Sequence, residues 1–278
     1  MKNWLKKATA CGALIAAAIA SSTSAQAVVP DRINHVLVAG SYISSKGLAC
    51  TIGVVLEKKR SFLEFSEYQK NMRYAVTAAH CTENGAVILG ENRSPIGKTI
   101  AIEHPYDTAL IELYPISSSS CDWISPITGG GPHCVPVTNY RPRAAGRVYL
   151  KREGADKTVP MVGPGSPARG SQLCVSGMMT GLNCSYSDAP LPEIWRPTLG
   201  DSKAGHTKRA SIQQGDSGGP VTNVNGLFYG IITGMSQPGS PVVNMMAYTP
   251  AQIIFKEYPE YVLAPSGWRT SSNDSAQS

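Results

Sequence analysis

Short apolar segments separated by turn-forming residues are the feature that most restricts how this chain can fold. Glycine and proline supply 27 and 20 of the 278 residues, which leaves little room for long helices. Apolar runs of strand length lie between these turn residues, a pattern typical of an all-β sandwich or barrel. The expected strands are residues 51–56, 74–77, 108–113, 147–151, 173–176, 227–233 and 245–249.

A single segment near the C-terminus has the pattern of a helix. Thr249 can cap it, Pro250 suits its first position, and apolar residues recur at roughly helical spacing from Ile253 to Val262. Pro259 would interrupt this helix or end it early. A polar tail follows at residues 266–278.

The N-terminus has the pattern of a secretory signal peptide at residues 1–27. A lysine-rich start precedes an apolar run at 8–20 and a small-residue cleavage site ending at Ala27. The run is too short to cross a bilayer, and the alternative is a buried N-terminal helix. Cleavage after Ala27 would give a secreted protein without a stable membrane anchor, and would halve the formal net charge of +6.

The charge and the cysteines restrict the partners further. The remaining charge is mild, and the basic stretches lack the aromatic pattern of a nucleic-acid-binding surface. Of seven cysteines, Cys11 lies in the signal segment, and the other six form an even set. Three disulfides are therefore expected in an exported chain, although spacing alone does not choose among the pairings. No C-x-x-C pair supports a zinc site.

Residues 125–142 are the expected boundary between two halves of the chain. The segment is rich in glycine and proline, so we expect a linker and not a continuous strand. It would separate a first half at 28–124 from a second half at 143–265.

A serine with the surroundings of a nucleophile lies in the motif G-D-S-G-G-P at 215–220. A serine hydroxyl reacts only when a base takes its proton and donors hold the developing oxyanion. The glycines flanking Ser217 permit a tight turn that can present the N–H groups of Gly215 and Ser217 as these donors. Alone, such a motif can equally be a surface turn.

Two further motifs supply a base and an acid. In T-A-A-H-C at 77–81, His80 ends an apolar strand, and in D-T-A-L at 107–110, Asp107 begins one. Each alone is ordinary, as a structural histidine or a solvated turn. Histidine, aspartate and serine together, in this order, favour a nucleophilic site.

Together the three motifs resemble those of the chymotrypsin-like (trypsin-fold) serine endopeptidases, especially secreted bacterial members of the streptogrisin and α-lytic type. The resemblance spans residues 33–263. It implies an all-β fold of two antiparallel six-stranded β-barrels with a C-terminal helix, and an active site between the barrels. It implies no cofactor and no metal.

The resemblance also implies a role for each site residue. Ser217 attacks the scissile carbonyl, His80 transfers the proton, and Asp107 orients the imidazole. The N–H groups of Gly215 and Ser217 form the oxyanion hole. The disulfides it implies are Cys50–Cys81, Cys174–Cys184 and, for the remaining two cysteines, Cys121–Cys134.

Asp216 departs from the family pattern because its usual cationic partner is missing. Many members use a freed N-terminal ammonium, and the bacterial subgroup uses an arginine where this chain has Val175. Arg169 and a processed N-terminus are the candidates. The mature chain could begin at Val28, or at Ile33 after cleavage following Arg32.

The resemblance places a neutral specificity pocket beside the serine. Ser211 would form the floor where trypsin-like members have an aspartate, and Thr233 would contact Asp107 from below. No histidine occupies the strand position used by glutamate-specific relatives. The pocket would therefore prefer small or medium apolar side chains at P1; its expected residues are Ser211, Thr233, Gly234, Met235 and Val243.

The sequence thus predicts a secreted, monomeric serine endopeptidase that acts on proteins or peptides. The alternative is a catalytically silent binding protein with the trypsin fold, or a member locked as a zymogen. An esterase of the α/β-hydrolase class is disfavoured, because its triad order places histidine last.

Overall fold

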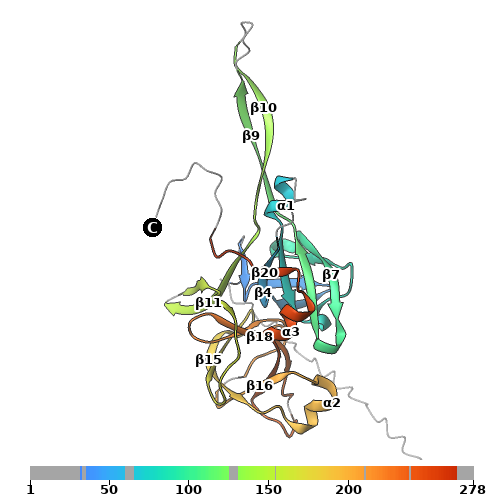
Figure 1. The fold of residues 1–278 in the computed structure, drawn as a ribbon, viewed down its shortest axis with the longest axis vertical. Helices are drawn as coiled ribbons and strands as arrows, with labels where there is room; N and C mark the ends of the chain where they lie inside the picture. The colour runs from blue at the N-terminus through green and yellow to red at the C-terminus, as the bar shows by residue number, and fades with distance from the viewer. Residues whose placement is uncertain are drawn as a thin grey trace, which may run out of the picture.

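The computed structural model describes Arg32 and residues 36–59, 66–124, 131–153, 155–209, 211–237 and 239–267. The predicted signal peptide, the possible N-termini at Val28 and Ile33, and all but the first two residues of the polar tail lie outside these ranges. Within them strands dominate, and the all-β prediction is confirmed. The strands form two main sheets and a long projecting hairpin (Figure 1).

The first main sheet carries eight strands and has the shape of a half-barrel. Its strands β5 and β8 are antiparallel, with Thr77 opposite Ala109. The end of β5 and the start of β8 therefore lie side by side, at the same end of the two strands. The residues just beyond them are brought close together. In order across the sheet, the strands are β20 (Tyr261–Leu263), β4 (Val54–Lys58), β5 (Arg73–Thr77), β8 (Thr108–Leu113), β7 (Pro95–Glu103), β6 (Val87–Leu89), β2 (Tyr42–Ser45) and β3 (Leu48–Thr51).

The second main sheet closes into a six-stranded barrel. Pairing between β18 and β19 joins its two ends, while the two-residue β13 lies outside the closed ring. In order, the strands are β13 (Gly163–Pro164), β18 (Leu227–Met235), β17 (Pro220–Thr222), β14 (Gln172–Gly177), β15 (Gly181–Ala189), β16 (Lys203–Thr207) and β19 (Met245–Pro250).

The two halves share one apolar core. Val54 and Leu110 of the first sheet pack in the same buried cluster as Phe228 and Ile231 of the second, and the helix α3 adds Ile254. A third sheet beside them combines β1 (Leu37–Ala39), β11 (Ala144–Glu153) and β12 (Ala155–Pro160), with β1 parallel to β11. The short helices are α1 (Glu67–Asn71), η2 (Ala79–Cys81), η3 (Glu91–Arg93), η4 (His104–Tyr106), η5 (Glu193–Trp195), α2 (Arg196–Leu199) and α3 (Ala251–Glu257).

The C-terminal helix is shorter than its sequence pattern indicates. Pro250 is its N-cap, it ends at Glu257, and Val262 belongs to β20, which pairs with β4. The Thr249 hydroxyl donates to the Tyr106 carbonyl and does not cap the helix. Pro259 comes directly after the C-cap residue Tyr258, and a proline ring cannot continue a helix.

The strand predicted at 51–56 is divided in two. β3 ends at Thr51 and β4 begins at Val54, with Gly53 between them. A Cβ at Gly53 would lie 2.4 Å from the Gly218 carbonyl oxygen, so only glycine fits where this segment contacts the other half.

Of the linker predicted at 125–142, residues 125–130 lie outside the described ranges, and residues 133–141 form a strand. Strands β9 (Ile116–Ile124) and β10 (His133–Arg141) pair residue for residue and project from the body as a two-stranded hairpin, which we call the arm (Figure 1). Cys121 and Cys134 are disulfide-bonded across it. Pro136 is tolerated in β10 because each strand of a two-stranded ribbon is an edge strand.

Removal of the arm disulfide tests whether the arm is independent of the body. In a Cys121→Ser/Cys134→Ser variant we expect faster hydrogen exchange in β9 and β10, because an isolated hairpin is marginally stable. The melting temperature of the body should change by less than about 2 °C, since the arm adds nothing to the shared core. A Cys50→Ser/Cys81→Ser variant is the control and should melt lower; an equal loss in both variants would contradict the independence.

Candidate active site

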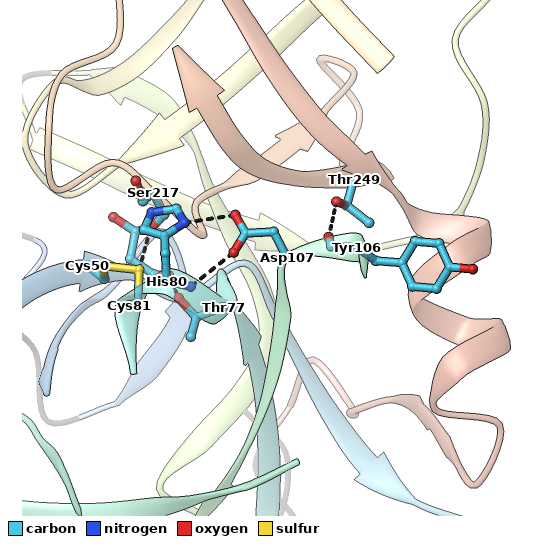
Figure 2. Close-up of polar contacts among 9 residues, drawn as sticks. Cys50, Thr77, His80, Cys81, Tyr106, Asp107, Ser217 and Thr249 are labelled. Atoms are coloured by element: carbon cyan, nitrogen blue, oxygen red, sulfur yellow. Dashed lines mark hydrogen bonds and ion pairs between the residues drawn. A yellow bond between two sulfur atoms is a disulfide. The ribbon is translucent and has the colours of Figure 1, made fainter. Parts of the chain in front are cut away.

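His80 and Asp107 form a two-point contact just beyond the end of β5 and the start of β8. The backbone N–H of His80 donates to Oδ1 of Asp107 at 2.9 Å, and the ring Nδ1 lies 2.8 Å from Oδ2 (Figure 2). Asp107 has φ of +50°, a left-handed conformation that aspartate tolerates better than most residues. The contact orients the ring and leaves Nε2 as the acceptor of the neutral imidazole.

The carboxylate also alters the basicity of the ring. The hydrogen bond to Asp107 raises the pKa of His80 above its ordinary 6.5; partial burial opposes this rise, and the negative charge of Asp107 adds to it. The His80 side chain is 48% exposed, so solvent still reaches the ring.

Ser217 lies on a turn that Thr51 fastens to the first sheet. The N–H of Thr51 donates to the Ser217 carbonyl at 2.9 Å, and its hydroxyl donates to the Gly215 carbonyl at 2.8 Å. Gly218 has φ of +81°, and a Cβ there would lie 2.1 Å from Oγ1 of Thr77. Glycine is thus required both by conformation and by space.

Two N–H groups of this turn are available to a ligand. In the described ranges neither the N–H of Gly215 nor that of Ser217 donates a hydrogen bond within the chain. Donors of this kind can stabilise an oxygen that develops negative charge.

A cleft of about 350 Å³ brings His80 and Ser217 to one surface. No hydrogen bond joins them in the described part of the chain, so one would have to form when a substrate binds, as is common for sites without ligand. The residues that line the cleft are Leu48, Ala49, Cys50, His80, Ile212, Gln213, Gln214, Gly215, Ser217, Ile232, Thr233, Gly234, Met235 and Gln237.

The predicted specificity pocket is only partly assembled here. Thr233, Gly234 and Met235 line the cleft, whereas Ser211 and Val243 do not. The Ser211 hydroxyl is 2.9 Å from the buried Tyr186 hydroxyl, and Val243 is 63% exposed.

Thr233 makes no hydrogen bond to Asp107, and three glutamines line the cleft besides the expected residues. The buried hydroxyl of Thr233 has no hydrogen-bond partner among the described residues, so a packing contact with Asp107 stays a prediction. The sequence analysis missed Gln213, Gln214 and Gln237 as lining residues. The first two directly precede the G-D-S-G-G-P motif, which was a usable signal.

Two disulfides support the site. Cys50–Cys81 ties β3 to the histidine turn, and Cys174–Cys184 ties β14 to β15. The dashed contact from Cys81 in Figure 2 joins its Sγ to the Ser217 carbonyl oxygen at 3.9 Å; a disulfide sulfur has no proton to donate, so this is packing only.

Among the described residues no cluster of three or more His, Cys, Asp or Glu could hold a metal ion.

No protein-family model and no curated protein sequence matches the chain. The structure is similar to solved serine-protease structures. Thermobifida fusca protease A is 15% identical (84% of this chain, 100% of that one, TM-score 0.53). Cellulomonas bogoriensis chymotrypsin is 18% identical (83% and 98%, TM-score 0.51), and a glutamic acid-specific serine protease is 19% identical (81% and 100%, TM-score 0.54).

These likenesses define the class of fold. The chain has the chymotrypsin-like, trypsin-type fold of the serine proteases, as its motifs predicted. The second barrel closes fully, while the first half is an eight-stranded half-barrel in place of the expected six-stranded barrel.

An Asp107→Asn variant tests the electrostatic coupling. We expect a lower His80 pKa, because the amide carries no charge to stabilise the imidazolium. Since folding raises this pKa above 6.5, the contact stabilises the fold at pH below about 6.5, and this stabilisation is lost as the pH rises through the folded-state pKa. An NMR titration of the His80 ring and melting curves at pH 5.5 and 8.5 measure both effects.

The control is Asp122→Asn on the arm, which should leave the titration unchanged. An unaltered His80 pKa in Asp107→Asn would contradict the coupling.

Proposed function

We propose that the protein is a serine endopeptidase that hydrolyses peptide bonds through an acyl-enzyme on Ser217. One observation carries the proposal: the histidine held by Asp107 and the serine with two free N–H donors lie in one cleft. The fold shared with serine proteases supports it.

In the proposed reaction, His80 is the general base. Its Nε2 takes the Ser217 proton as Oγ attacks the carbonyl carbon, while the negatively charged oxygen accepts hydrogen bonds from the N–H groups of Gly215 and Ser217. The imidazolium, stabilised by Asp107, then gives this proton to the leaving amine. Water attacks the remaining ester by the same route and releases the carboxylic acid.

The chemistry of the cleft supports a preference for uncharged P1 side chains. His80 is the only titratable residue among the described residues that line it. The similar glutamic acid-specific protease is described as binding substrate through a histidine triad, and this cleft offers no second histidine. We propose small or medium apolar P1 residues, with Gly234 and Met235 beside them.

We further propose that the protein acts outside the cytoplasm, as a monomer, on protein or peptide substrates. The three disulfides favour an oxidising compartment. None of the helices in the described ranges has the length and apolar character needed to cross a membrane. The signal peptide remains a sequence prediction.

Covalent labelling tests the nucleophile. A fluorophosphonate probe should form one adduct, on Ser217, and label neither Ser217→Ala nor the heat-denatured protein. Ser217→Ala should also lose roughly 10³-fold or more in kcat, while a Ser118→Ala variant on the arm keeps full activity. A folded protein that takes up no probe would favour the silent or zymogen-locked alternative.

A peptide library tests the specificity. Cleavage should occur mainly after small or medium apolar residues and should slow at low pH, because a protonated His80 cannot act as a base. The acid-limb midpoint of kcat/KM should lie above 6.5, since Asp107 raises the pKa of His80. Dominant cleavage after Arg, Lys or Glu would contradict the neutral pocket.

A further inference from the structure

Asp216, next to the nucleophile, carries a fully buried carboxylate. A buried charge is costly unless it is paired or well hydrogen-bonded. The sequence analysis named two candidate cationic partners for Asp216, which are Arg169 and a processed N-terminus.

The structure gives Asp216 neutral partners instead. Oδ1 accepts from the N–H groups of Met179 and Thr180 at 2.9 and 3.1 Å. Oδ2 accepts from the Thr180 hydroxyl at 2.7 Å and from the N–H of Gln213 at 2.9 Å. Among the described residues, these are the only groups that donate hydrogen bonds to the Asp216 carboxylate, and none of them is a cation.

The turn between β14 and β15 is shaped to receive this carboxylate. A Cβ on Gly177 would lie 2.0 Å from Oδ1, so only glycine allows so close an approach. The next residue of the turn, Met178, donates its N–H to the Thr51 hydroxyl at 3.1 Å. The same hydroxyl donates to the Gly215 carbonyl, so the turn, Thr51 and the nucleophile loop form one network.

This network fixes the segment that presents the oxyanion donors. Gln213 donates to the Asp216 carboxylate, and the Asp216 N–H donates back to the Gln213 carbonyl at 3.1 Å. Gly215 lies inside this closed turn, with φ of +100°. The direction of its N–H therefore depends on the position of Asp216.

A second, independent observation concerns Arg32, the residue after which an activating cleavage would occur. Its side chain is fully buried, and Nη1 donates to the Ser176 hydroxyl at 2.7 Å and to the Gly40 carbonyl at 3.2 Å. The guanidinium also lies 4.2 Å from the centre of the Tyr149 ring. The folded chain thus encloses Arg32 between elements of both halves and does not present it to a protease.

We propose that Thr180 is a positioning residue: its hydroxyl, with the N–H groups of Met179 and Thr180, takes the place of a cation on Asp216 and holds the oxyanion hole in shape without cleavage after Arg32. The inference rests on the proposed serine-protease function. The proposal predicts that the protein is active while Arg32 is still attached to it.

The first test compares Thr180→Val, which removes the hydroxyl at nearly constant volume, with Thr180→Ser, which keeps it. We expect Thr180→Val to lower kcat by roughly 10- to 100-fold, the range for loss of a hydrogen bond to a charged group, with KM within about twofold. Thr180→Ser should restore kcat to within about threefold. Thr138→Val on the arm is the matched control and should behave as the wild type.

The outcomes separate the two proposals. If Thr180→Val folds and keeps wild-type kcat and probe-labelling rate, the role of Thr180 is wrong while the protease remains. If it only melts lower, with kcat of the folded fraction unchanged, the hydroxyl is merely structural and the inference is again wrong. If the wild type takes up no fluorophosphonate in any form, both proposals fail.

The second test concerns the N-terminus. Protein that begins at Val28, and protein carrying extra residues before Val28, should both be active, and mass spectrometry of the labelled species should find Arg32 attached. Activity that appears only in a species beginning at Ile33 would overturn the inference.

Discussion

The hydrogen bonds from Thr51 to the nucleophile loop connect the two halves at the point where the proposed chemistry occurs. The N–H of Thr51 reaches the Ser217 carbonyl, and its hydroxyl reaches that of Gly215. Thr51 is the last residue of β3 and directly follows Cys50, which is bonded to the histidine turn. Thr51 is thus hydrogen-bonded to the loop of the proposed nucleophile and adjacent to the cysteine that holds the turn of the proposed base. The site can keep its geometry only while the two halves remain joined.

The sequence allowed prediction of those features that depend on local patterns. Alternating short apolar runs indicated the all-β class. The three motifs located His80 and Ser217, which line one cleft, and Asp107, which contacts the His80 ring. The fold followed from the resemblance, because those motifs occur in a fixed order within it. The antiparallel pairing of β5 and β8 explains why a histidine and an aspartate 27 residues apart come into contact.

Features that depend on distant neighbours could not be predicted in this way. Val262 continues a helical pattern, but β4 offers it an edge to pair with. Pro136 argued against a strand, yet the arm consists entirely of edge strands. The neutral donors of Asp216 are mostly backbone N–H groups, which every residue carries and no motif marks. Val243 followed the family spacing but lies on the surface, because the pocket depends on the path of a loop.

The arm enters and leaves the body at one place, since Ile116 and Arg141 are paired partners at its base. Residues can therefore be added to the arm or removed from it without changing the path of either main sheet. An engineered chain should tolerate a longer, shorter or exchanged ribbon here, and a foreign epitope or tether attached to the arm would project from the body (Figure 1).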